Sequence, residues 1–220
     1  MKRLAILGAS GHGKVVAEIA ELNGWDVVFF DDAFPSVNGL AHWPVIGTTE
    51  DLLNDLQRFD GCFVAIGNNR IRLDKQTMLT EKGATLPVLI HPLAVISRYA
   101  NVQAGCVVMA GAVVNPFALV QQACIVNTAS TIDHDCILAE GVHISPGANL
   151  AGGVSVGACS WIGIGASVKQ CVQIGANVVV GAGAAVVSDI ADNLTVVGVP
   201  ARALDSFFSD GASRCARDAE

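Results

Sequence analysis

Residues 114–150 read VNPFALVQQACIVNTASTIDHDCILAEGVHISPGANL, and they form the middle of a longer stretch with the same pattern. From residue 96 to residue 186, every sixth residue is Val, Ile or Leu, with no insertion or deletion. The residue two places earlier is Ala, Ser or Cys in twelve of the sixteen cases. The branched positions are Ile96, Val102, Val108, Val114, Val120, Val126, Ile132, Leu138, Ile144, Leu150, Val156, Ile162, Val168, Ile174, Val180 and Val186.

A repeat of six residues excludes an amphipathic α-helix, whose apolar residues recur about every 3.6 residues, and a single strand, in which they alternate. It is typical of a chain wound into a parallel β-helix, in which each repeat forms one wall of the coil. The branched side chain fills the interior, and the small one lies where the chain turns a corner. We therefore expect a β-helix domain over residues 92–204, with coils stacked at about 4.8 Å.

The composition offers ample material for a core and an acidic surface. Of the 220 residues, 52% are apolar and 15% are charged, and the net charge is −7. This charge argues against nucleic acid as a partner. We expect no membrane insertion, because no segment has the roughly eighteen uninterrupted apolar residues that span a bilayer. Residues 1–3 lead directly into a strand, without the pattern of a signal peptide.

The seven cysteines follow packing rather than pairing. No two of them have metal-ligand spacing, and Cys106, Cys124 and Cys136 occupy the small position of the repeat, where a thiol acts as a compact apolar group. The number of cysteines is odd. We therefore predict a reducing cytoplasm, and we predict no metal site.

The first 91 residues have the pattern of a Rossmann-like nucleotide-binding domain. A strand at 3–8 meets the glycine-rich segment 8–14, GASGHGK, followed by a helical pattern at 15–22 and a second strand at 25–30. Glycines let this loop approach a diphosphate, and the first free N–H groups of the helix point at it. The alternative is a tight turn without a ligand. The predicted diphosphate-binding residues are Ser10, Gly11, His12 and Gly13, although His12 is as well explained as a helix cap.

Further polar residues follow the other predicted strands of this domain. Asp31 and Asp32 come after the second strand and fit hydrogen bonding to a base or ribose. Gly67 and Asn69 come after a third strand at 62–66. Ligands of open α/β sheets bind at the carboxyl ends of the strands, so all four are predicted substrate-binding residues. A helix at 70–82 and a fourth strand at 86–90 complete the domain, and the last part of the chain, 205–220, is a predicted C-terminal tail.

Five motifs of the chain resemble those of the hexapeptide-repeat sugar acyltransferases. This family includes bacterial sialic acid O-acetyltransferases and N-acetyltransferases of nucleotide-linked 4-amino-4,6-dideoxy sugars. The resemblance implies a triangular, left-handed prism, a hand that the spacing itself does not indicate. It also implies a homotrimer with acetyl-CoA between two prisms and a nucleotide sugar across the N-terminal domain. The motifs are 8–13 GASGHG, 65–69 AIGNN, 133–136 DHDC, 143–148 HISPGA and 197–201 VGVPA.

The resemblance assigns the catalytic base to His134. An attacking amine loses a proton as it bonds to the thioester carbonyl, and histidine titrates near neutral pH. An adjacent carboxylate fixes the tautomer of the ring. Neighbouring strand residues point to opposite faces, so Asp135 contacts the ring only if the backbone bends. Asp133 is the competing partner, and Asp135 is preferred.

Four further residues belong to the expected transfer site. By resemblance, His143 binds acetyl-CoA near the thioester, and Asn127 corresponds to a polar residue lining the substrate site. His143 lies half a coil after His134, so the two imidazoles meet only across a trimer interface. Gly152 lies one coil after His134, and its N–H is a candidate donor to the developing oxyanion of bound acetyl-CoA. Trp161 is explained equally by trimer packing and by a CoA contact.

The sequence thus predicts an acetyl-CoA-dependent N-acetyltransferase acting on the 4-amino group of a nucleotide-linked 4-amino-4,6-dideoxy sugar. Transfer is expected to be direct, because no cysteine beside the site has the surroundings of an activated nucleophile. The alternative is an O-acetyltransferase acting on a sugar hydroxyl such as that of sialic acid. A zinc-dependent carbon dioxide hydratase would need three histidine ligands. A purely structural solenoid would leave the glycine loop and the Asp-His-Asp cluster unexplained.

Overall fold

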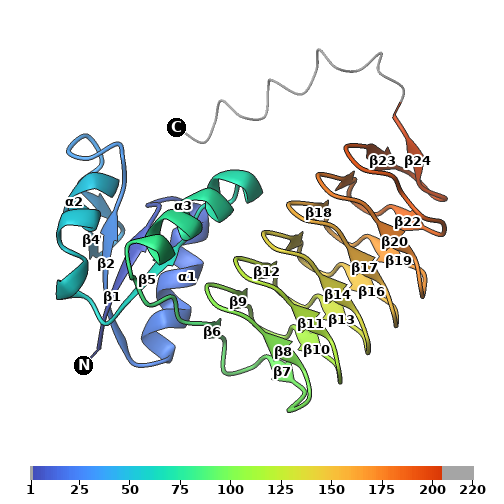
Figure 1. Ribbon diagram of the computed structural model, residues 1–220, viewed down its shortest axis with the longest axis horizontal. Coiled ribbons are helices and arrows are strands. Elements are labelled where there is room, and N and C mark those ends of the chain that lie inside the picture. Colours follow the sequence, from blue (N-terminus) through green and yellow to red (C-terminus); the bar gives the residue numbers. More distant parts are fainter. Residues whose placement is uncertain (1, 205–220) are drawn as a thin grey trace.

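The computed structural model describes residues 2–204, and the predicted tail at 205–220 lies outside the described residues. An N-terminal α/β domain lies beside a stack of β-helix coils (Figure 1). The coils rise along the chain from green to red. The domain, in blue to teal, faces their early part.

The N-terminal sheet is parallel and has three strands. β1 (Lys2–Leu7) lies in the centre, between β2 (Trp25–Phe30) and β5 (Gly61–Val64). Leu4 and Ile6 face one core, and Ala5 and Leu7 face another on the opposite side of the sheet. Because both faces are covered, these strands are continuous apolar runs rather than alternating ones.

Helices cover this sheet on both sides. α1 (Gly11–Leu22) contributes to the core that also contains residues of the β-helix, while α2 (Thr49–Asn54) and α3 (Asn69–Glu81) contribute to the other core. A capping box between Thr48 and Asp51 begins α2. A 3-10 helix, η1 (Leu56–Arg58), follows α2. A small hairpin pairs β3 (Gly39–Leu40) with β4 (Trp43–Pro44).

The rest of the chain forms three walls of short, mainly parallel strands. As far as β22, each strand pairs with the one eighteen residues later, as between β9 and β12, and the last parallel pair, β21 with β23, has a spacing of sixteen. Wall I contains β6 (Leu89–Ile90), β9 (Val107–Val108), β12 (Ile125–Val126), β15 (His143–Ile144), β18 (Trp161–Ile162), β21 (Val179–Val180), β23 (Thr195–Val197) and the antiparallel β24 (Arg202–Ala203). Wall II contains β7 (Val95–Ile96), β10 (Val113–Val114), β13 (Thr131–Ile132), β16 (Asn149–Leu150), β19 (Ser167–Val168) and β22 (Ala185–Val186). Wall III contains β8 (Asn101–Val102), β11 (Leu119–Val120), β14 (Ile137–Leu138), β17 (Ser155–Val156) and β20 (Gln173–Ile174).

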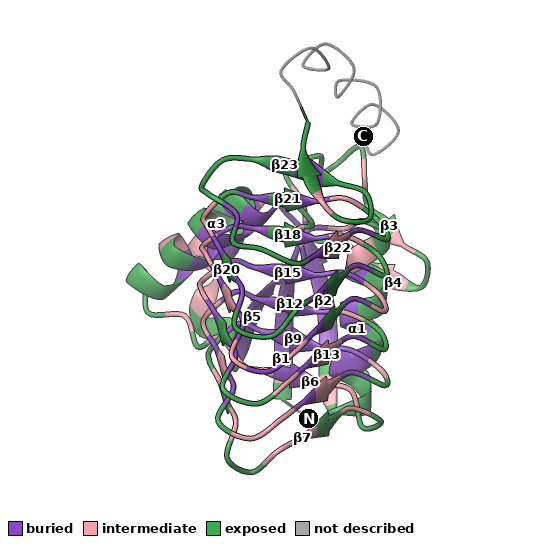
Figure 2. Cartoon of the chain, turned by 90° about the vertical axis from the view of Figure 1, so that its right-hand side faces the viewer, coloured by how far each residue is buried: buried purple, intermediate pink, exposed green. Residues whose placement is uncertain are grey.

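The six-residue column is the interior of this prism, as the sequence predicts. Val108, Val126 and Ile144 are completely buried, and so are the small residues Cys106 and Cys124 two places before the first two of them. Figure 2 shows the ladder of wall I with its buried residues in purple. The predicted fold class is confirmed: a Rossmann-like N-terminal domain precedes a left-handed parallel β-helix.

The fourth strand expected for the N-terminal sheet was a wrong prediction. β6 pairs with β9 and is the first strand of wall I, although the preceding Thr85 still accepts a hydrogen bond from the backbone of Cys62 in β5. The reason is that the two parts share a core, in which outward residues of wall I such as Val107 and Ile125 pack with those of β1 and α1. An apolar run at 86–90 satisfies either sheet.

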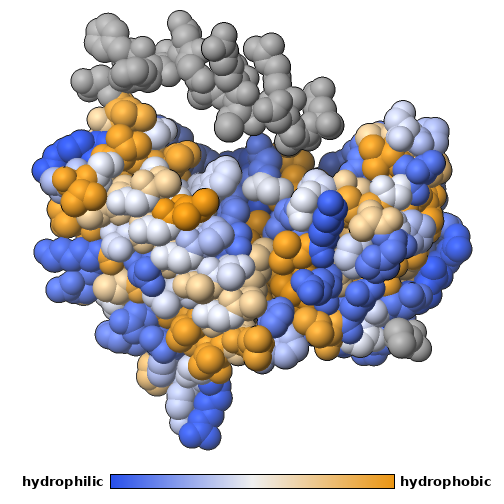
Figure 3. All heavy atoms as spheres, turned by 180° about the vertical axis from the view of Figure 1, so that it is seen from behind, coloured by the Kyte–Doolittle hydropathy of each residue, from blue (hydrophilic) through white to orange (hydrophobic). Residues whose placement is uncertain are grey.

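The outer surface of the molecule is mixed. The view from behind shows hydrophobic residues interspersed with hydrophilic ones over the coils (Figure 3). Among residues 2–204, no helix combines the length and the apolar character needed to cross a membrane.

Candidate active site

A cavity of about 450 Å³ opens at the carboxyl ends of β1, β2 and β5. This is the edge at which the sequence predicts nucleotide binding. The cavity brings together five of the predicted substrate-binding residues, which come from three separate loops. Its polar and glycine lining consists of Gly8, Ser10, His12, Asp31, Asp32, Gly67, Asn68 and Lys75.

Two of the three glycines in the glycine loop, Gly8 and Gly13, are required by the backbone and its packing. Gly8 has a backbone φ of +112°, which residues other than glycine rarely adopt. A Cβ atom at Gly13 would lie 2.6 Å from the carbonyl oxygen of Gly8, so the strand and α1 require glycine there. Gly11 and Gly67 face open space, so internal packing does not explain them. Ser10 precedes α1 in extended conformation and makes no side-chain capping bond, which leaves its hydroxyl at the cavity.

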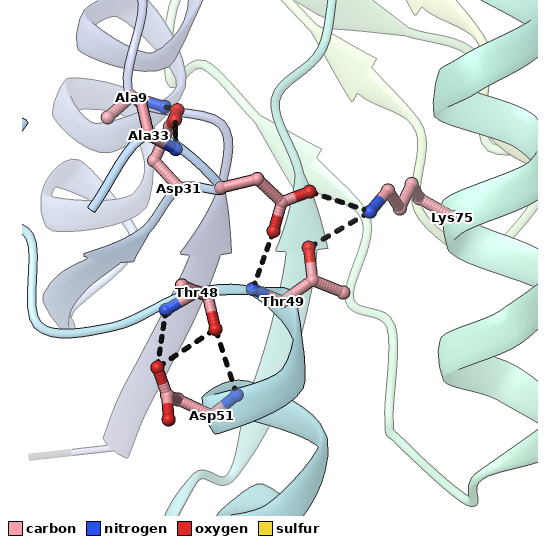
Figure 4. Close-up of polar contacts among 8 residues, drawn as sticks. Ala9, Asp31, Ala33, Thr48, Thr49, Asp51 and Lys75 are labelled. Atoms are coloured by element: carbon pink, nitrogen blue, oxygen red, sulfur yellow. Dashed lines mark hydrogen bonds and ion pairs between the residues drawn. The ribbon is translucent and has the colours of Figure 1, made fainter. Parts of the chain in front are cut away.

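The two acids after β2 have different partners (Figure 4). The Asp31 carboxylate accepts hydrogen bonds from the backbone N–H groups of Ala9, at 2.7 Å, and Ala33, at 2.9 Å, and thereby fixes the glycine loop. The Asp32 carboxylate accepts from the Thr49 N–H at 2.9 Å and from Lys75 Nζ at 3.0 Å. Partial burial opposes ionisation of Asp32, but the hydrogen bonds from Thr49 and Lys75 prevail and lower its pKa.

His134 lies at the exposed corner between walls II and III, immediately after β13. Its Nδ1 is 2.8 Å from Oδ2 of Asp135, whereas Asp133 accepts from the backbone N–H of His134 and from Asn115. Asp135 has φ +59°, and this left-handed residue is the bend that lets neighbouring side chains meet. The hydrogen bond to Asp135, followed by the charge of Asp133, raises the pKa of His134.

Gly152 lies beneath the His134 ring in the next coil. A Cβ atom at Gly152 would be 2.5 Å from both Nε2 and Cε1 of His134. Glycine at this position therefore makes room for the imidazole. Beside the ring, a groove of about 460 Å³ runs along wall II and is lined in part by Asn115, Asp133 and Ala151.

His143 lies on another face of the prism, in β15 of wall I. Its ring stacks on Trp161 at 5.2 Å and 13°, and its Nε2 is 3.1 Å from the amide nitrogen of Asn127. Trp161 donates its Nε1–H to the Ser145 hydroxyl. Burial, with smaller contributions from the charges of Arg72 and His12, lowers the pKa of His143 to about 3. His143 is therefore neutral at physiological pH.

His12 and His143 each keep one buried nitrogen without a partner within residues 2–204, Nε2 in the former and Nδ1 in the latter. Burial and the charge of Arg72 lower the pKa of His12 to about 4. The two imidazoles come from the N-terminal domain and from wall I, and His12 makes a small contribution to the lowered pKa of His143. They offer neutral donors or acceptors near the junction of the two parts of the chain.

The structure separates the predicted residues into groups. The nucleotide cavity holds Ser10, His12, Asp31, Asp32 and Gly67, with Gly11 and Gly13 in the adjoining first turn of α1; wall I holds Asn127 and His143; and the exposed corner holds His134, Asp135 and Gly152. Asn69 faces away from the cavity, since its amide donates to the carbonyls of Cys159 and Ser160 and accepts from Arg72.

The sequence did not indicate a role for two residues of α3. Lys75 lines the cavity and contacts Asp32, and Arg72 is completely enclosed between the cavity loop and the coils. Helical spacing places both residues one or two turns after the loop at 67–69, but it does not distinguish them from residues on a solvated face. Within residues 2–204, no group of three or more His, Cys, Asp or Glu side chains is placed to hold a metal ion.

Known proteins share this fold. Residues 3–79 match the family model described as the PglD N-terminal domain. The acetyltransferase domain of PglB from Neisseria gonorrhoeae FA1090, solved with acetyl coenzyme A, is 47% identical with a TM-score of 0.88, over 92% of this chain and 99% of that one. A variant of perosamine N-acetyltransferase from Caulobacter crescentus, solved with CoA and GDP-perosamine, is 36% identical with a TM-score of 0.90, over 94% and 98%.

A curated relative is also similar in sequence to this chain, over a shorter stretch. UDP-N-acetylbacillosamine N-acetyltransferase from Bacillus subtilis (strain 168) is 38% identical over 118 residues, which are 50% of this chain and 52% of the relative. The match thus spans about half the length of that enzyme. The left-handed β-helix built from six-residue repeats defines the class of hexapeptide-repeat transferases, and here it is joined to a Rossmann-like domain. Within that class, the chain belongs to the sugar acyltransferase family.

Proposed function

We propose that the protein is an acetyl-CoA-dependent N-acetyltransferase that acts on the 4-amino group of a nucleotide-linked 4-amino-4,6-dideoxy sugar. The observation that carries the proposal is the combination of the 450 Å³ cavity at the strand edge with an exposed His134–Asp135 pair on the prism. The relatives named above are N-acetyltransferases or an acetyltransferase domain by name, and their solved forms hold CoA, acetyl-CoA or GDP-perosamine.

The cavity suits the nucleotide part of such a substrate. α1 begins at Gly11, directly after the cavity-lining Ser10, and the first N–H groups of a helix have no partner within it, so a diphosphate would gain hydrogen bonds and a favourable helix dipole there. Gly11 and Gly67 face open space, which lets a ligand approach the backbone. Lys75 adds a positive charge, and Asp32 offers acceptors for a base or ribose.

The proposed chemistry is direct transfer with His134 as general base. Nδ1–H donates to Asp135, so Nε2 carries the lone pair. As the sugar amine forms its bond to the thioester carbonyl carbon, Nε2 takes the amine proton. The carbon–sulfur bond then breaks, and the same proton passes to the departing thiolate to give free CoA. Burial raises the pKa of the nearby Cys136, whose thiol donates to a carbonyl, and this supports transfer without an acyl-enzyme.

We further propose that the working unit is a homotrimer. In one chain His134 lies at the corner between walls II and III, whereas His143, Asn127 and the nucleotide cavity lie on the side of wall I. A neighbouring prism that brings its His134 to this side completes the site. Acetyl-CoA then lies between two prisms, along a groove such as that on wall II.

The free thiols within the described residues support the predicted location in the cytoplasm.

A panel of UDP- and GDP-linked 4-amino sugars incubated with acetyl-CoA tests the function. We expect at least one to gain the mass of an acetyl group. His134→Ala should lower the turnover by about 10² to 10⁴, the contribution of one general base, while the matched control His42→Ala, on an exposed histidine of the N-terminal domain, retains it. Acetylation of free sialic acid alone, or an unchanged rate in His134→Ala, contradicts the proposal.

A further inference from the structure

α3 contacts the coils through a row of polar side chains and through the apolar Leu73, which packs against Ala123 and Cys159. Asn69, Arg72 and Gln76 follow helical spacing, and each donates to carbonyl groups at one column of coil corners. The residues of this column recur every eighteen positions and have left-handed backbones. They are Gly105, Ala123, Gly141 and Cys159.

The two repeats match in length, which explains how one helix contacts successive coils. A turn of α-helix rises about 5.4 Å, and stacked strands lie about 4.8 Å apart. The three side chains at i, i+3 and i+7 thus reach four consecutive corners, because Arg72 contacts two of them. A Cβ atom at Gly105 would collide with the Gln76 side chain, which shows how closely the helix approaches.

Arg72 is the centre of this contact and is only 1% exposed. Its guanidinium donates to the carbonyls of Ala123 and Gly141, both at 2.8 Å, and to the Asn69 side chain at 2.9 Å. It also donates to the carbonyls of Ile66 at 3.0 Å and Gly67 at 3.2 Å. None of the ion pairs within residues 2–204 includes Arg72.

A buried charge without a counter-ion is costly, so its hydrogen bonds must hold it in place. Burial lowers the pKa of Arg72 only to about 10, so it remains charged at neutral pH. The Ile66–Gly67 loop forms part of the nucleotide cavity. Gly141 leads into β15, which carries His143, and Ala123 leads into β12, which precedes Asn127. One side chain thus bonds both parts of the expected site.

We propose that Arg72 is a positioning residue, whose guanidinium fixes the Ile66–Gly67 loop of the nucleotide cavity relative to the wall that carries Asn127 and His143. The bound nucleotide sugar is thereby held in register with the transfer site. This inference rests on the proposed function. Its second consequence is electrostatic, because the charge of Arg72 favours the neutral form of His12 and His143.

The kinetic test compares Arg72→Lys with Gln76→Met. Arg72→Lys keeps the charge but loses most of the hydrogen bonds, whereas Gln76→Met removes a contact of α3 with Ala104 away from the cavity. We expect Arg72→Lys to lower kcat/KM for the nucleotide sugar about tenfold or more, mainly through KM, and to weaken calorimetric binding of UDP or GDP. Gln76→Met should retain the wild-type constants even where its unfolding midpoint falls.

A test without catalysis follows the histidine resonances by NMR. In Arg72→Met, the pKa values of His12 and His143 should rise, while in Arg72→Lys they should stay low. The charged and titratable groups facing these imidazoles are Arg72 and each other, and the thiols of Cys106, Cys124 and Cys159 face Arg72. If Arg72→Met does not fold, Arg72→Lys and the UDP or GDP binding decide the question.

The outcomes separate this inference from the proposed function. Wild-type kinetic constants and UDP and GDP affinities in Arg72→Lys, with a loss of stability like that of Gln76→Met, would overturn the positioning role. A wild-type protein that binds UDP or GDP but transfers no acetyl group would overturn the proposed function. In that case, weakened binding in Arg72→Lys but not in Gln76→Met still supports the inference.

Discussion

At the residue scale, the geometry of one dipeptide determines whether the prism has a usable base. Asp135 contacts the His134 ring because its backbone is left-handed, a conformation that costs a non-glycine residue some energy. The same conformation recurs in this corner column at Phe117 and Cys171. The bend is therefore a property of the coil, and a histidine and an acid placed there become a pair.

The protonation of His134 gives the first prediction. Its pKa is raised, and a general base must be unprotonated, so kcat/KM should rise with pH and level off above a pKa that exceeds the usual 6.5. In Asp135→Asn the main stabiliser of the imidazolium is gone. The rising limb should then move to lower pH while the plateau falls. Initial rates across pH 5–9 measure this shift. If the rising part of the profile has the same midpoint in Asp135→Asn as in the wild type, His134 is not the general base.

Gly152 gives the second prediction. Because a Cβ atom there would collide with the His134 imidazole, Gly152→Ala should turn the ring away and reduce kcat about ten- to a hundredfold. The ring is exposed and free to move, so the unfolding midpoint should change little. The control is the double variant with His134→Ala. If Gly152 acts through the ring, its substitution has no further effect there, and an equal loss in both backgrounds would disprove that.

Some residue roles followed from the sequence and others did not. His134 and Asp135 stand in one short motif, and the residues of the nucleotide cavity follow strands whose carboxyl ends meet at one edge. Arg72 contacts the coils and Lys75 contacts Asp32 in the cavity, but both lie on a largely polar helix, and no local pattern distinguishes such contacts from a solvated face. For the same reason, the sequence led us to assign Asn69 to the cavity, although its side chain contacts the coils.

At the element scale, the six-residue column determines the prism, and this gives the third prediction. Ile144 is completely buried in the interior, whereas Ile137 faces outward and is 44% exposed. Ile144→Ala should lower the free energy of unfolding by about 2–5 kcal/mol, and Ile137→Ala by much less. Chemical denaturation followed by circular dichroism measures both. Equal losses would contradict the assignment of the column to the interior.

The six-residue column could be predicted from the sequence because every coil repeats the same packing in its interior. The core shared by α1, β1 and wall I could not be predicted. An outward apolar residue such as Val107 or Ile125 indicates that the wall is covered but does not indicate which element covers it. β6 was placed in the wrong sheet for that reason. Two apolar residues beside a proline satisfy either partner, and long-range pairing determines the choice.

At the scale of the whole molecule, the separation of His134 from the nucleotide cavity gives the fourth prediction. Gly67→Trp should fill the cavity, because no atom of the chain occupies the space beside Gly67, and should abolish activity alone. When Gly67→Trp is mixed with an equal amount of His134→Ala and the two are reassembled from denaturant, about a quarter of the wild-type activity should return. In a random trimer half of the subunits have an intact cavity and half have an intact His134, so about a quarter of the shared sites contain both. Mixtures that stay inactive after confirmed exchange would contradict the shared site.

The most direct measurement is a competition between two acceptors in one reaction with acetyl-CoA. One is a nucleotide-linked 4-amino-4,6-dideoxy sugar, and the other is the same nucleotide sugar with a hydroxyl group at that carbon. We expect that the amine alone gains an acetyl group, in a product that hydroxylamine does not cleave because it is an amide. Acetylation of the hydroxyl compound, in a product that hydroxylamine cleaves as an ester, would contradict it.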